Sequence, residues 1–210
     1  TAKSIVKLSV CEITESKIVD GDQIVKNGLR DPRLGPLSGL CQTCNLSKQC
    51  CPGHFAHITF PEPLLHIAFI NPILHWLKIL CDDCGEILVK KELDIRDIPK
   101  NKLLNFYAKN IYSKCPRCLK KQAKYAYKKD TLTIIKNKEL FSTKEILDHI
   151  NRADDAAIEA FDFEHPKHLL LTVLPVPPPT VRPPLMLGDT VRGEDDLTYR
   201  LLGILRAKEK

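Results

Sequence analysis

CQTCNLSKQCCPGH, residues 41–54, places four cysteines and one histidine within fourteen positions. Cys41 and Cys44 form a C-x2-C pair, and Cys51 and His54 form a C-x2-H pair six residues further on. Tetrahedral zinc takes four nitrogen or sulfur ligands, and such closely spaced pairs let two ligands share one ion without strain. We therefore predict a zinc site made of Cys41, Cys44, Cys51 and His54, which leaves Cys50 outside it.

A rival nitrogen ligand for this site is His57. It lies six residues beyond Cys51, outside the two-residue spacing, so His54 is favoured. Pro52 and Gly53 stiffen and then turn the chain between Cys51 and His54, which brings the two side chains together.

A second set of cysteines follows the same spacing. Cys81 and Cys84 form one C-x2-C pair, and Cys115 and Cys118 form another after thirty intervening residues. A site of four thiolates has no open position for water, so this pattern predicts a structural zinc ion and argues against metal-assisted hydrolysis. We expect Cys11 and Cys50 to be free thiols.

Two pairings of these four short motifs are open. Sequential pairing gives the two sites above, whereas a cross-brace, as in a RING ubiquitin ligase, would pair the first motif with the third. A RING also needs a central H-x2-C element, and His54 is followed by Phe55, Ala56 and His57 with no cysteine. Sequential pairing is therefore preferred.

Composition restricts the class of protein and its compartment. The chain has 210 residues, of which 43% are hydrophobic, so it can bury a core. It has nine cysteines and no secretory signal at its N-terminus, which favours metal ligands in a reducing, intracellular location over a disulfide framework. A formal net charge of +6 weakly favours nucleic acid as a partner.

The positive charge is concentrated around the fourth cysteine motif. Residues 114–129 contain no acidic residue. Such a stretch predicts a phosphate-facing surface, although charge runs are also common on merely solvated faces. The candidate nucleic-acid residues in it are Lys114, Arg117, Lys120, Lys121 and Lys124.

Short helices and short strands are expected along the chain. The apolar alternation of residues 4–10 predicts a strand. Residues 58–80 begin as a strand and continue as a helix, with Asn71 as its cap and Pro72 at its first position. Residues 86–113 are expected to be helical, centred on residues 101–112, and a hairpin over 124–135 follows.

The last third of the chain carries clear boundary signals. Ser142 and Glu145 form a capping box before a short helix, and residues 154–161 predict another. Residues 169–176 read as a buried strand that ends in the stiff segment PPPTVRPP. A final helix over residues 194–208 has Leu197, Leu201 and Leu205 on one stripe. The fold class is therefore mixed α+β.

Five motifs together resemble one protein family. From about Gly28 to the C-terminus, the chain is similar to the N-terminal clamp region of the largest subunit of multisubunit DNA-dependent RNA polymerases of the eukaryotic and archaeal type. The motifs, in the family's order, are DPRLG (31–35), CQTC (41–44), CPGHF (51–55), LPVPPPTVRPP (174–184) and EDDLTYRLLGI (194–204).

The resemblance implies an irregular, zinc-stabilised clamp that holds DNA and the RNA–DNA hybrid. It implies a clamp core with the first zinc site over residues 1–80, a clamp head with the second over 81–140, and a return to the core over 141–210. In the family the proline-rich segment belongs to the lid, here Pro177 to about Asp189, where Arg182 would extend towards nucleic acid. The implied partners are the remainder of the largest subunit, the second-largest and other subunits, DNA template and nascent RNA, with no membrane.

Catalysis is not expected from this chain alone. The family's catalytic aspartates lie in a motif of the form NADFDGD, which does not occur here, so Mg²⁺ is expected only in the complete polymerase. Compared with the family's subunit, the chain looks like an excerpt, a processed piece or a split-gene product. A stand-alone zinc protein that binds nucleic acid is the alternative function.

The lineage is left open by this resemblance. The compact spacing of Cys115 and Cys118 looks archaeal, whereas Ala56 replaces the family's usual glycine and the short spans between motifs also suit a large DNA virus. The expected location is accordingly the nucleus for a eukaryotic protein, the cytoplasm for an archaeal one, and the virus factory or virion for a viral one.

Overall fold

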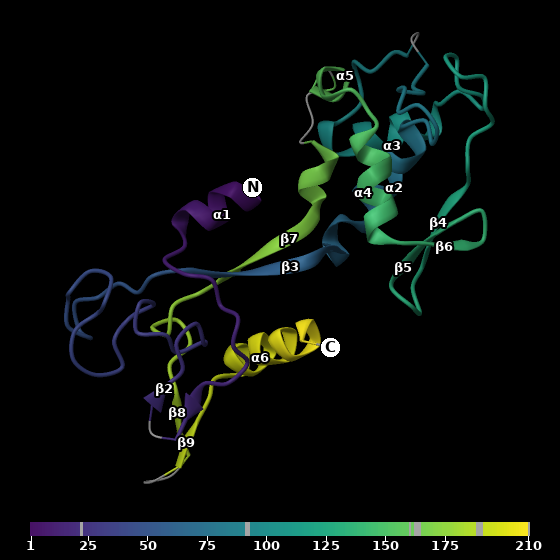
Figure 1. Ribbon diagram of the computed structural model, residues 1–210. Coiled ribbons are helices and arrows are strands. Elements are labelled where there is room, and N and C mark those ends of the chain that lie inside the picture. The colour runs from purple at the N-terminus through teal and green to yellow at the C-terminus, as the bar shows by residue number, and fades with distance from the viewer. Residues whose placement is uncertain (22, 91–92, 160, 162–164, 188–190, 210) are drawn as a thin grey trace. The chain divides into compact units, whose positions relative to one another are not determined.

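The computed structural model describes residues 1–21, 23–90, 93–159, 161, 165–187 and 191–209 (Figure 1). Short helices and short strands alternate with long loops, which confirms the mixed α+β class. The chain divides into two compact units. Unit 1 contains Thr1–Pro61 and Thr172–Lys210, and unit 2 contains Glu62–Leu171. The finer division at residues 80 and 140 stays a prediction.

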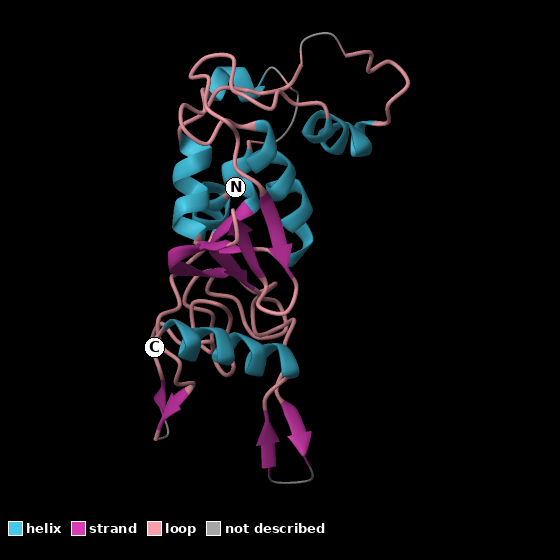
Figure 2. Cartoon of the chain, turned by 90° about the vertical axis from the view of Figure 1, so that its right-hand side faces the viewer, coloured by secondary structure: helices cyan, strands magenta, loops and turns pink. Residues whose placement is uncertain are grey.

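Unit 1 is rich in loops, with two small antiparallel hairpins and two helices (Figure 2). Its elements are α1 (Ala2–Leu8), β1 (Val19–Asp20), β2 (Gln23–Ile24), β8 (Leu185–Leu187), β9 (Val191–Gly193) and α6 (Asp196–Lys208). A hydrophobic cluster of Ile13, Leu29, Leu34, Ile58, Val176, Leu201, Leu202 and Leu205 forms its core. No described helix of the chain is long and apolar enough to cross a membrane.

The predicted final helix is confirmed, and it begins at Asp196, two residues later than expected. Asp195 is the N-cap, and its carboxylate accepts from the Leu197 N–H at 2.8 Å. Leu201 and Leu205 are buried as expected, but Leu197 is 40% exposed. The buried stripe is completed by Thr198 instead, because the helix turns that residue, and not Leu197, towards the core.

The strand predicted for residues 4–10 is wrong. Helix α1 covers most of this stretch, with Thr1 as its N-cap, and buries none of its residues. The extended pairing starts only at Val10, whose N–H donates to the Phe55 carbonyl at 2.9 Å, and continues with the bridge between Glu12 and His57. Residues 4–8 lack a neighbouring strand, so local capping decides their conformation.

Unit 2 is built from helices and one three-stranded sheet. Strands β3 (Ala56–Leu65) and β7 (Leu170–Val176) pair with each other, and the chain enters unit 2 within β3 and leaves it within β7. The other elements are η1 (Ile67–Phe69), α2 (Ile70–Ile79), α3 (Lys100–Lys109), β4 (Tyr125–Lys128), β5 (Thr133–Lys136), β6 (Glu139–Phe141), α4 (Thr143–Asn151), α5 (Asp155–Glu159) and η2 (Pro166–Leu169).

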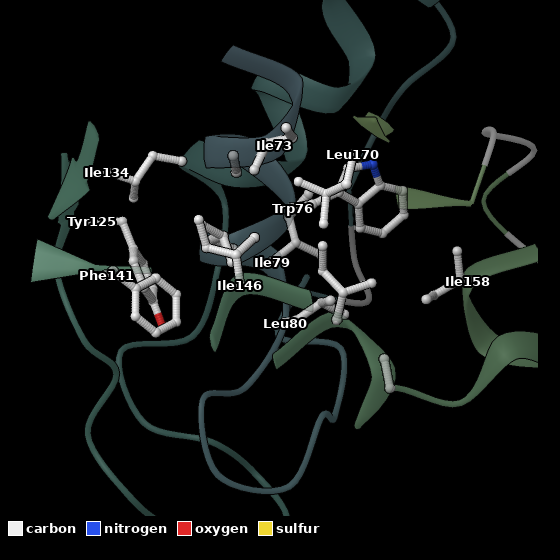
Figure 3. Close-up of a cluster of buried hydrophobic side chains, with 14 of the residues drawn as sticks. Ile73, Trp76, Ile79, Leu80, Tyr125, Ile134, Phe141, Ile146, Ile158 and Leu170 are labelled. Atoms are coloured by element: carbon white, nitrogen blue, oxygen red, sulfur yellow. The ribbon is translucent and has the colours of Figure 1, made fainter. Parts of the chain in front are cut away.

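The core of unit 2 surrounds helix α2. Its Ile73, Trp76 and Ile79 pack with Ile146 of α4 and with aromatic residues of the sheet (Figure 3). Burying side chains of this size is worth about 1.5–3 kcal/mol each. This cluster therefore gives unit 2 a hydrophobic core of its own.

Strands β4, β5 and β6 form an antiparallel meander with one buried face. Ile134 pairs with Tyr127 on one side and with Phe141 on the other. Ile134 and Phe141 are buried, whereas Leu140, on the opposite face, is 67% exposed. The period of two along each strand thus directs one face of the sheet to the core. The hairpin expected over residues 124–135 is confirmed.

Two helix starts follow different rules. Ser142 and Glu145 form the expected capping box, with the Ser142 N–H donating to Glu145 Oε2 at 2.8 Å. Helix α2 begins at Ile70, with Phe69 and not Asn71 as its N-cap. Pro72 still falls in the first helical turn, where a missing N–H costs no intrahelical hydrogen bond.

Gly39 and Gly85 have the same φ but different surroundings, so a comparison of the two shows how closely the chain packs beside Cys81 and Cys84. Gly39 and Gly85 both have a φ of +73°. A Cβ at Gly39 would meet nothing within 4 Å, whereas one at Gly85 would overlap the backbone carbonyl of Arg152.

We expect Gly39→Ala to cost about 1 kcal/mol of unfolding free energy from φ strain alone. Gly85→Ala should cost clearly more, which urea unfolding of the zinc-loaded chain would measure. Equal losses would contradict the packing described.

Candidate metal centres

The first cluster lies in unit 1 and contains Cys41, Cys44, Cys51 and His54. Their ligand atoms all lie within 4.8 Å of one another. Cys44 Sγ is 3.6 Å from Cys51 Sγ, and Cys51 Sγ is 3.7 Å from His54 Nε2. A disulfide bond would need about 2.05 Å. Four ligands placed tetrahedrally at about 2.3 Å from an ion are separated by about 3.8 Å. The spacing therefore fits a shared metal ion.

The backbone of this cluster forms two tight turns. The Cys41 N–H donates to the Leu46 carbonyl at 2.9 Å, and the Asn45 N–H donates to the Cys41 carbonyl at 2.9 Å. Asn45 adopts a φ of +56°, which asparagine tolerates better than most residues. In the second turn the Gly53 N–H donates to Cys51 Sγ at 3.4 Å. N–H groups directed at sulfur stabilise the thiolate form that binds metal.

The motif DPRLG braces this cluster from one side. Asp31 accepts from Arg33 Nε at 2.8 Å and from the Asn27 N–H at 2.7 Å. Burial raises the pKa of Asp31, but these hydrogen bonds outweigh it and lower the pKa to about 2. The Arg33 carbonyl accepts from Thr43 Oγ1 at 2.7 Å, and the Leu34 carbonyl accepts from the His54 N–H at 2.8 Å. The loop thus holds both ligand turns.

The proline-rich segment packs on the other side of the cluster. A Cβ at Gly53 would lie 2.5 Å from Pro178 Cβ and 2.6 Å from Thr180 Oγ1, so only glycine fits there. Thr180 Oγ1 also donates to the Pro52 carbonyl at 3.4 Å. The segment therefore holds the second ligand turn in place.

The second cluster lies in unit 2 and contains Cys81, Cys84, Cys115 and Cys118. Its ligand atoms also lie within 4.8 Å of one another. The Sγ atoms of Cys81 and Cys118 are 3.6 Å apart, as are those of Cys84 and Cys115. The four motifs are thus grouped in sequential order in both clusters, and not as a cross-brace.

The same turn geometry recurs in the second cluster. The N–H groups of Cys81 and Cys115 donate to the carbonyls of Glu86 and Lys120, at 2.8 and 3.0 Å. The residue after each second cysteine again has a positive φ, +73° at Gly85 and +60° at Leu119. A C-x2-C pair thus produces the same local fold in three places.

Electrostatics explain why each cluster needs a cation. Burial raises the pKa of the Cys81 thiol, but N–H groups of Cys84 and Asp83 bring it down to about 7. Burial and the neighbouring thiols raise the pKa of Cys84 to about 12. Cys51 in the first cluster is raised in the same way, to about 11. Three closely spaced thiolates in the first cluster and four in the second would repel one another, and a bound divalent ion would remove that repulsion.

Gln122 joins the two ligand turns of the second cluster. Its Nε2 donates to Cys81 Sγ at 3.4 Å and to the Lys120 carbonyl at 3.1 Å, and its Oε1 accepts from the Asp82 N–H at 3.3 Å. The Gln122 side chain therefore contacts the candidate ligand Cys81, the turn that carries Cys81, and the turn that carries Cys115 and Cys118.

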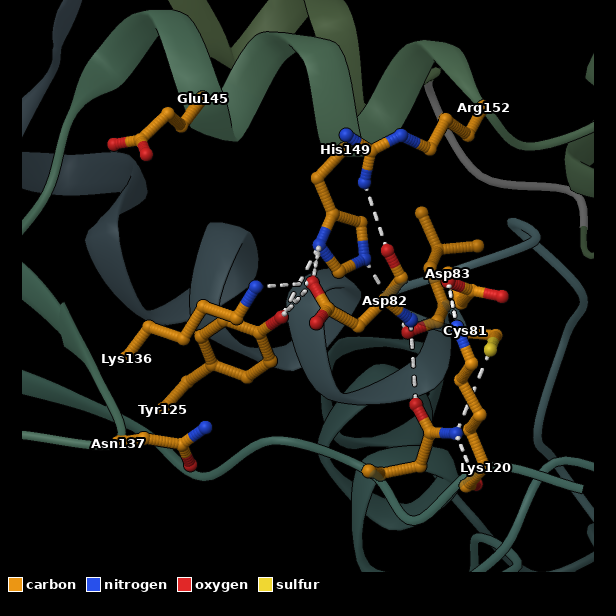
Figure 4. Close-up of polar contacts among 12 residues, drawn as sticks. Cys81, Asp82, Asp83, Lys120, Tyr125, Lys136, Asn137, Glu145, His149 and Arg152 are labelled. Atoms are coloured by element: carbon orange, nitrogen blue, oxygen red, sulfur yellow. Dashed lines mark hydrogen bonds and ion pairs between the residues drawn. The ribbon is translucent and has the colours of Figure 1, made fainter.

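Asp82 ties the cluster to the sheet and to helix α4 (Figure 4). Its Oδ1 lies 3.4 Å from Nδ1 of the buried His149 and accepts from Lys136 Nζ at 2.6 Å and from the Tyr125 hydroxyl at 3.1 Å. These contacts, led by His149, hold the pKa of Asp82 well below its usual range. The Arg152 guanidinium donates to the Asp82 carbonyl at 2.7 Å.

Sequence reasoning missed Gln122 and the Asp82 network. The signal available in the sequence was Asp82 inside C-D-D-C, but no nearby residue in the sequence indicated its partner. His149 and Tyr125 are distant in the chain and reach Asp82 only through the packing of α4 on the sheet.

Other predicted residues lie outside both clusters. His57 Nδ1 is 2.7 Å from Ser9 Oγ, away from the ligand set. Cys11 is buried and Cys50 is exposed, and neither joins a group of metal-ligating residues in the described part of the chain.

Arg182 does not extend outward as the sequence led us to expect. Its side chain is 0% exposed. It donates to the carbonyls of Pro177 and Leu29 and, at 3.2 Å, to Thr198 Oγ1. Burial, with the charge of Arg30, lowers the pKa of Arg182 to about 10. The guanidinium satisfies backbone groups of the proline-rich segment and so has no surface to offer nucleic acid. The predicted lid residues 188–190 lie outside the described part.

The candidate basic residues of the second cluster are exposed. They are Lys114, Arg117, Lys120, Lys121 and Lys124. Arg117 Nη1 lies 3.7 Å from Glu86 Oε2, and Lys120 Nζ lies 2.5 Å from Asp83 Oδ1. Exposed ion pairs of this kind contribute little, so a polyanion can displace these acids at small cost.

Both clusters could hold zinc. The donors are soft thiolates and one imidazole, their separations suit a tetrahedron, and N–H groups point at the sulfurs. Such an ion would cross-link the loops and supply no open coordination position. The fold and these clusters define a loop-rich α+β protein with two candidate structural metal sites.

Comparison with models of known protein families shows which family this chain belongs to. The family model described as RNA polymerase Rpb1, domain 1 matches residues 1–210, and the chain belongs to this family.

Individual relatives agree with this family. The chain is 35% identical to the DNA-directed RNA polymerase subunit Rpo1N of Methanothermobacter thermautotrophicus and 32% identical to that of Sulfolobus acidocaldarius, covering 97% of this chain and 26% of each relative. It is 32% identical to the DNA-directed RNA polymerase II subunit RPB1 of Euplotoides octocarinatus, over 99% of this chain and 51% of that relative. The chain thus spans about a quarter to a half of these relatives.

Two adjacent cysteines test the first cluster. We expect two zinc ions per chain and expect Cys51→Ser to retain one, because three ligands hold the ion poorly. Cys50→Ser should retain both. The lost ion should destabilise unit 1 by several kcal/mol, up to about 10. Elemental analysis and a thermal melt measure both effects, and equal zinc contents in the two variants would contradict the ligand set.

Replacing Gln122 tests its role beside the second cluster. Gln122→Met keeps the length of the side chain but deletes its donors and acceptor, so we expect zinc to leave the second cluster about tenfold faster. Transfer of zinc to a chromophoric chelator measures the rate. Gln42→Met, at an exposed glutamine in the first cluster, is the control. Unchanged release from Gln122→Met would exclude this role.

Proposed function

We propose that this chain forms the clamp of a DNA-directed RNA polymerase and holds DNA and the RNA–DNA hybrid during transcription. Membership of the Rpb1 domain 1 family carries the proposal. The relatives are named as polymerase subunits and are longer than this chain, so the partners we propose are the remainder of the largest subunit, the second-largest and other subunits, template DNA and nascent RNA.

Two zinc ions would give the clamp its rigidity. One would fix the loops of unit 1 between DPRLG and the proline-rich segment, and the other would fix the loop that carries the basic residues of unit 2. A stiff loop holds its charges in place, so less conformational entropy is lost when nucleic acid binds.

The chemistry of nucleotide addition would lie elsewhere in the complete enzyme. The chain lacks the NADFDGD motif, and we propose that Mg²⁺ is bound only by the assembled polymerase. The compartment would be that of the transcribing polymerase, the cytoplasm for an archaeal protein and the nucleus for a eukaryotic one.

Lys114 and Lys121 give the clearest electrostatic support for contact with nucleic acid. They face each other across an isolated antiparallel bridge, and both are exposed. Like charges directly opposite each other destabilise a bridge, whereas a phosphate between them would relieve the repulsion.

Neutralising this pair in the assembled polymerase tests the proposal. We expect Lys114→Gln with Lys121→Gln to shorten the half-life of elongation complexes, because phosphate contacts are lost, and to lower the slope of log affinity against log salt by about 1 for each lost contact. Nucleotide addition at low salt should be unchanged. Lys3→Gln with Lys144→Gln removes the same charge from other exposed positions as the control. If both pairs behave alike, the basic loop does not hold nucleic acid.

A further inference from the structure

Leu119 occupies a position where leucine is costly. It follows the second cysteine of its motif, as Asn45 and Gly85 follow theirs, and all three have a positive φ. In each case the N–H donates to the carbonyl of the first cysteine, at 2.9 Å for Leu119. The turn therefore requires a left-handed residue, which asparagine and glycine provide at low cost and leucine does not.

Packing does not explain this leucine. Its side chain is 74% exposed, among the highest values for large apolar residues of the described chain. An apolar side chain held in a strained and solvated position contributes neither a favourable backbone conformation nor burial. A strained and exposed apolar residue becomes a candidate for function when its surroundings also suit a ligand.

The surroundings of Leu119 are cationic. Lys114 and Lys121 face each other across the bridge at the base of the turn, and Arg117 and Lys120 lie within two residues of Leu119. Among the described residues, the acids that pair with these four cations are the half-buried Glu86 and the exposed Asp83. Leu119 is thus an exposed apolar residue in a loop that carries four cationic residues.

A partner for such a tip must be anionic around an accessible apolar surface. Nucleic acid has this character where base stacking is interrupted, because the bases are then open and phosphates flank them on both sides. Leucine is among the side chains that proteins insert between base steps. An acidic protein would match the charge but would need an apolar pocket at the same spacing.

We propose that Leu119 is an apolar wedge that contacts unstacked bases, so that the loop of residues 114–121 binds an unpaired site in DNA in preference to continuous duplex. The inference rests on the proposed function that this chain binds nucleic acid. It adds the kind of DNA site and the residue that selects it.

Leu119→Gly separates binding from folding. Glycine relieves the positive φ, so the variant should melt about 2–4 °C higher than the wild type. The matched control is Leu132→Gly, because Leu132 is also exposed (54%) and has a φ of +52°, but lies in the turn between β4 and β5. Both variants should gain stability, and only Leu119→Gly should lose DNA selectivity.

The test measures binding of the zinc-loaded 210-residue chain by fluorescence anisotropy. The probes are a labelled paired duplex, the same duplex with a central three-nucleotide bubble, and polyglutamate as competitor. We expect the wild type and Leu132→Gly to bind the bubble about tenfold more tightly than the duplex, and expect this preference to fall to near onefold in Leu119→Gly. Binding to paired duplex should be unchanged.

The remaining outcomes would contradict either the proposed role of Leu119 or the proposal that this chain binds nucleic acid. If the wild type binds both DNAs but Leu119→Gly keeps its preference, or Leu132→Gly loses it as well, the wedge is wrong and the clamp proposal stands. If polyglutamate competes as strongly as bubble DNA and Leu119→Gly weakens both equally, the tip serves an acidic protein. If the wild type binds neither DNA, nucleic-acid binding by this chain fails as well.

Discussion

Repulsion between neighbouring thiolates is the constraint on which the rest of this structure depends. Each cluster holds its ligand atoms within 4.8 Å, so several negative charges would share a small volume if all the thiols ionised. The raised pKa values of Cys51 and Cys84 express this conflict. A divalent ion bound at each cluster would resolve it and would at the same time tie together the loops that carry the ligands.

The two clusters are supported in different ways. The first is braced by hydrogen bonds from the DPRLG loop and by close packing of Pro178 and Thr180 against Gly53. The second is supported by polar side chains, with Gln122 joining its two turns and Asp82 linking it to His149 and Tyr125. Loss of a bound metal would therefore loosen the packing of the proline-rich segment in unit 1, and the packing of the β4–β5–β6 sheet and α4 in unit 2.

Strain and unfavourable charge are concentrated on one exposed loop of unit 2. Leu119 has a left-handed backbone, and Lys114 and Lys121 are held opposite each other. A metal ion held by Cys115 and Cys118 would fix the loop in this shape despite its own preferences. The proposed contact with nucleic acid would then use charges and an apolar residue that are already in place.

The sequence by itself determined the features that depend on short spacing. The four closely spaced cysteine and histidine pairs, the capping box at Ser142, the hairpin after residue 124 and the final helix all rest on contacts between residues a few positions apart, which local chemistry dictates. Only the tertiary structure decided what lies opposite each residue. It turned Arg182 inward to backbone carbonyls, left residues 4–8 without a strand partner, and brought Gln122 to Cys81 and His149 to Asp82. Those outcomes depend on long-range packing, for which no spacing in the sequence is a signal.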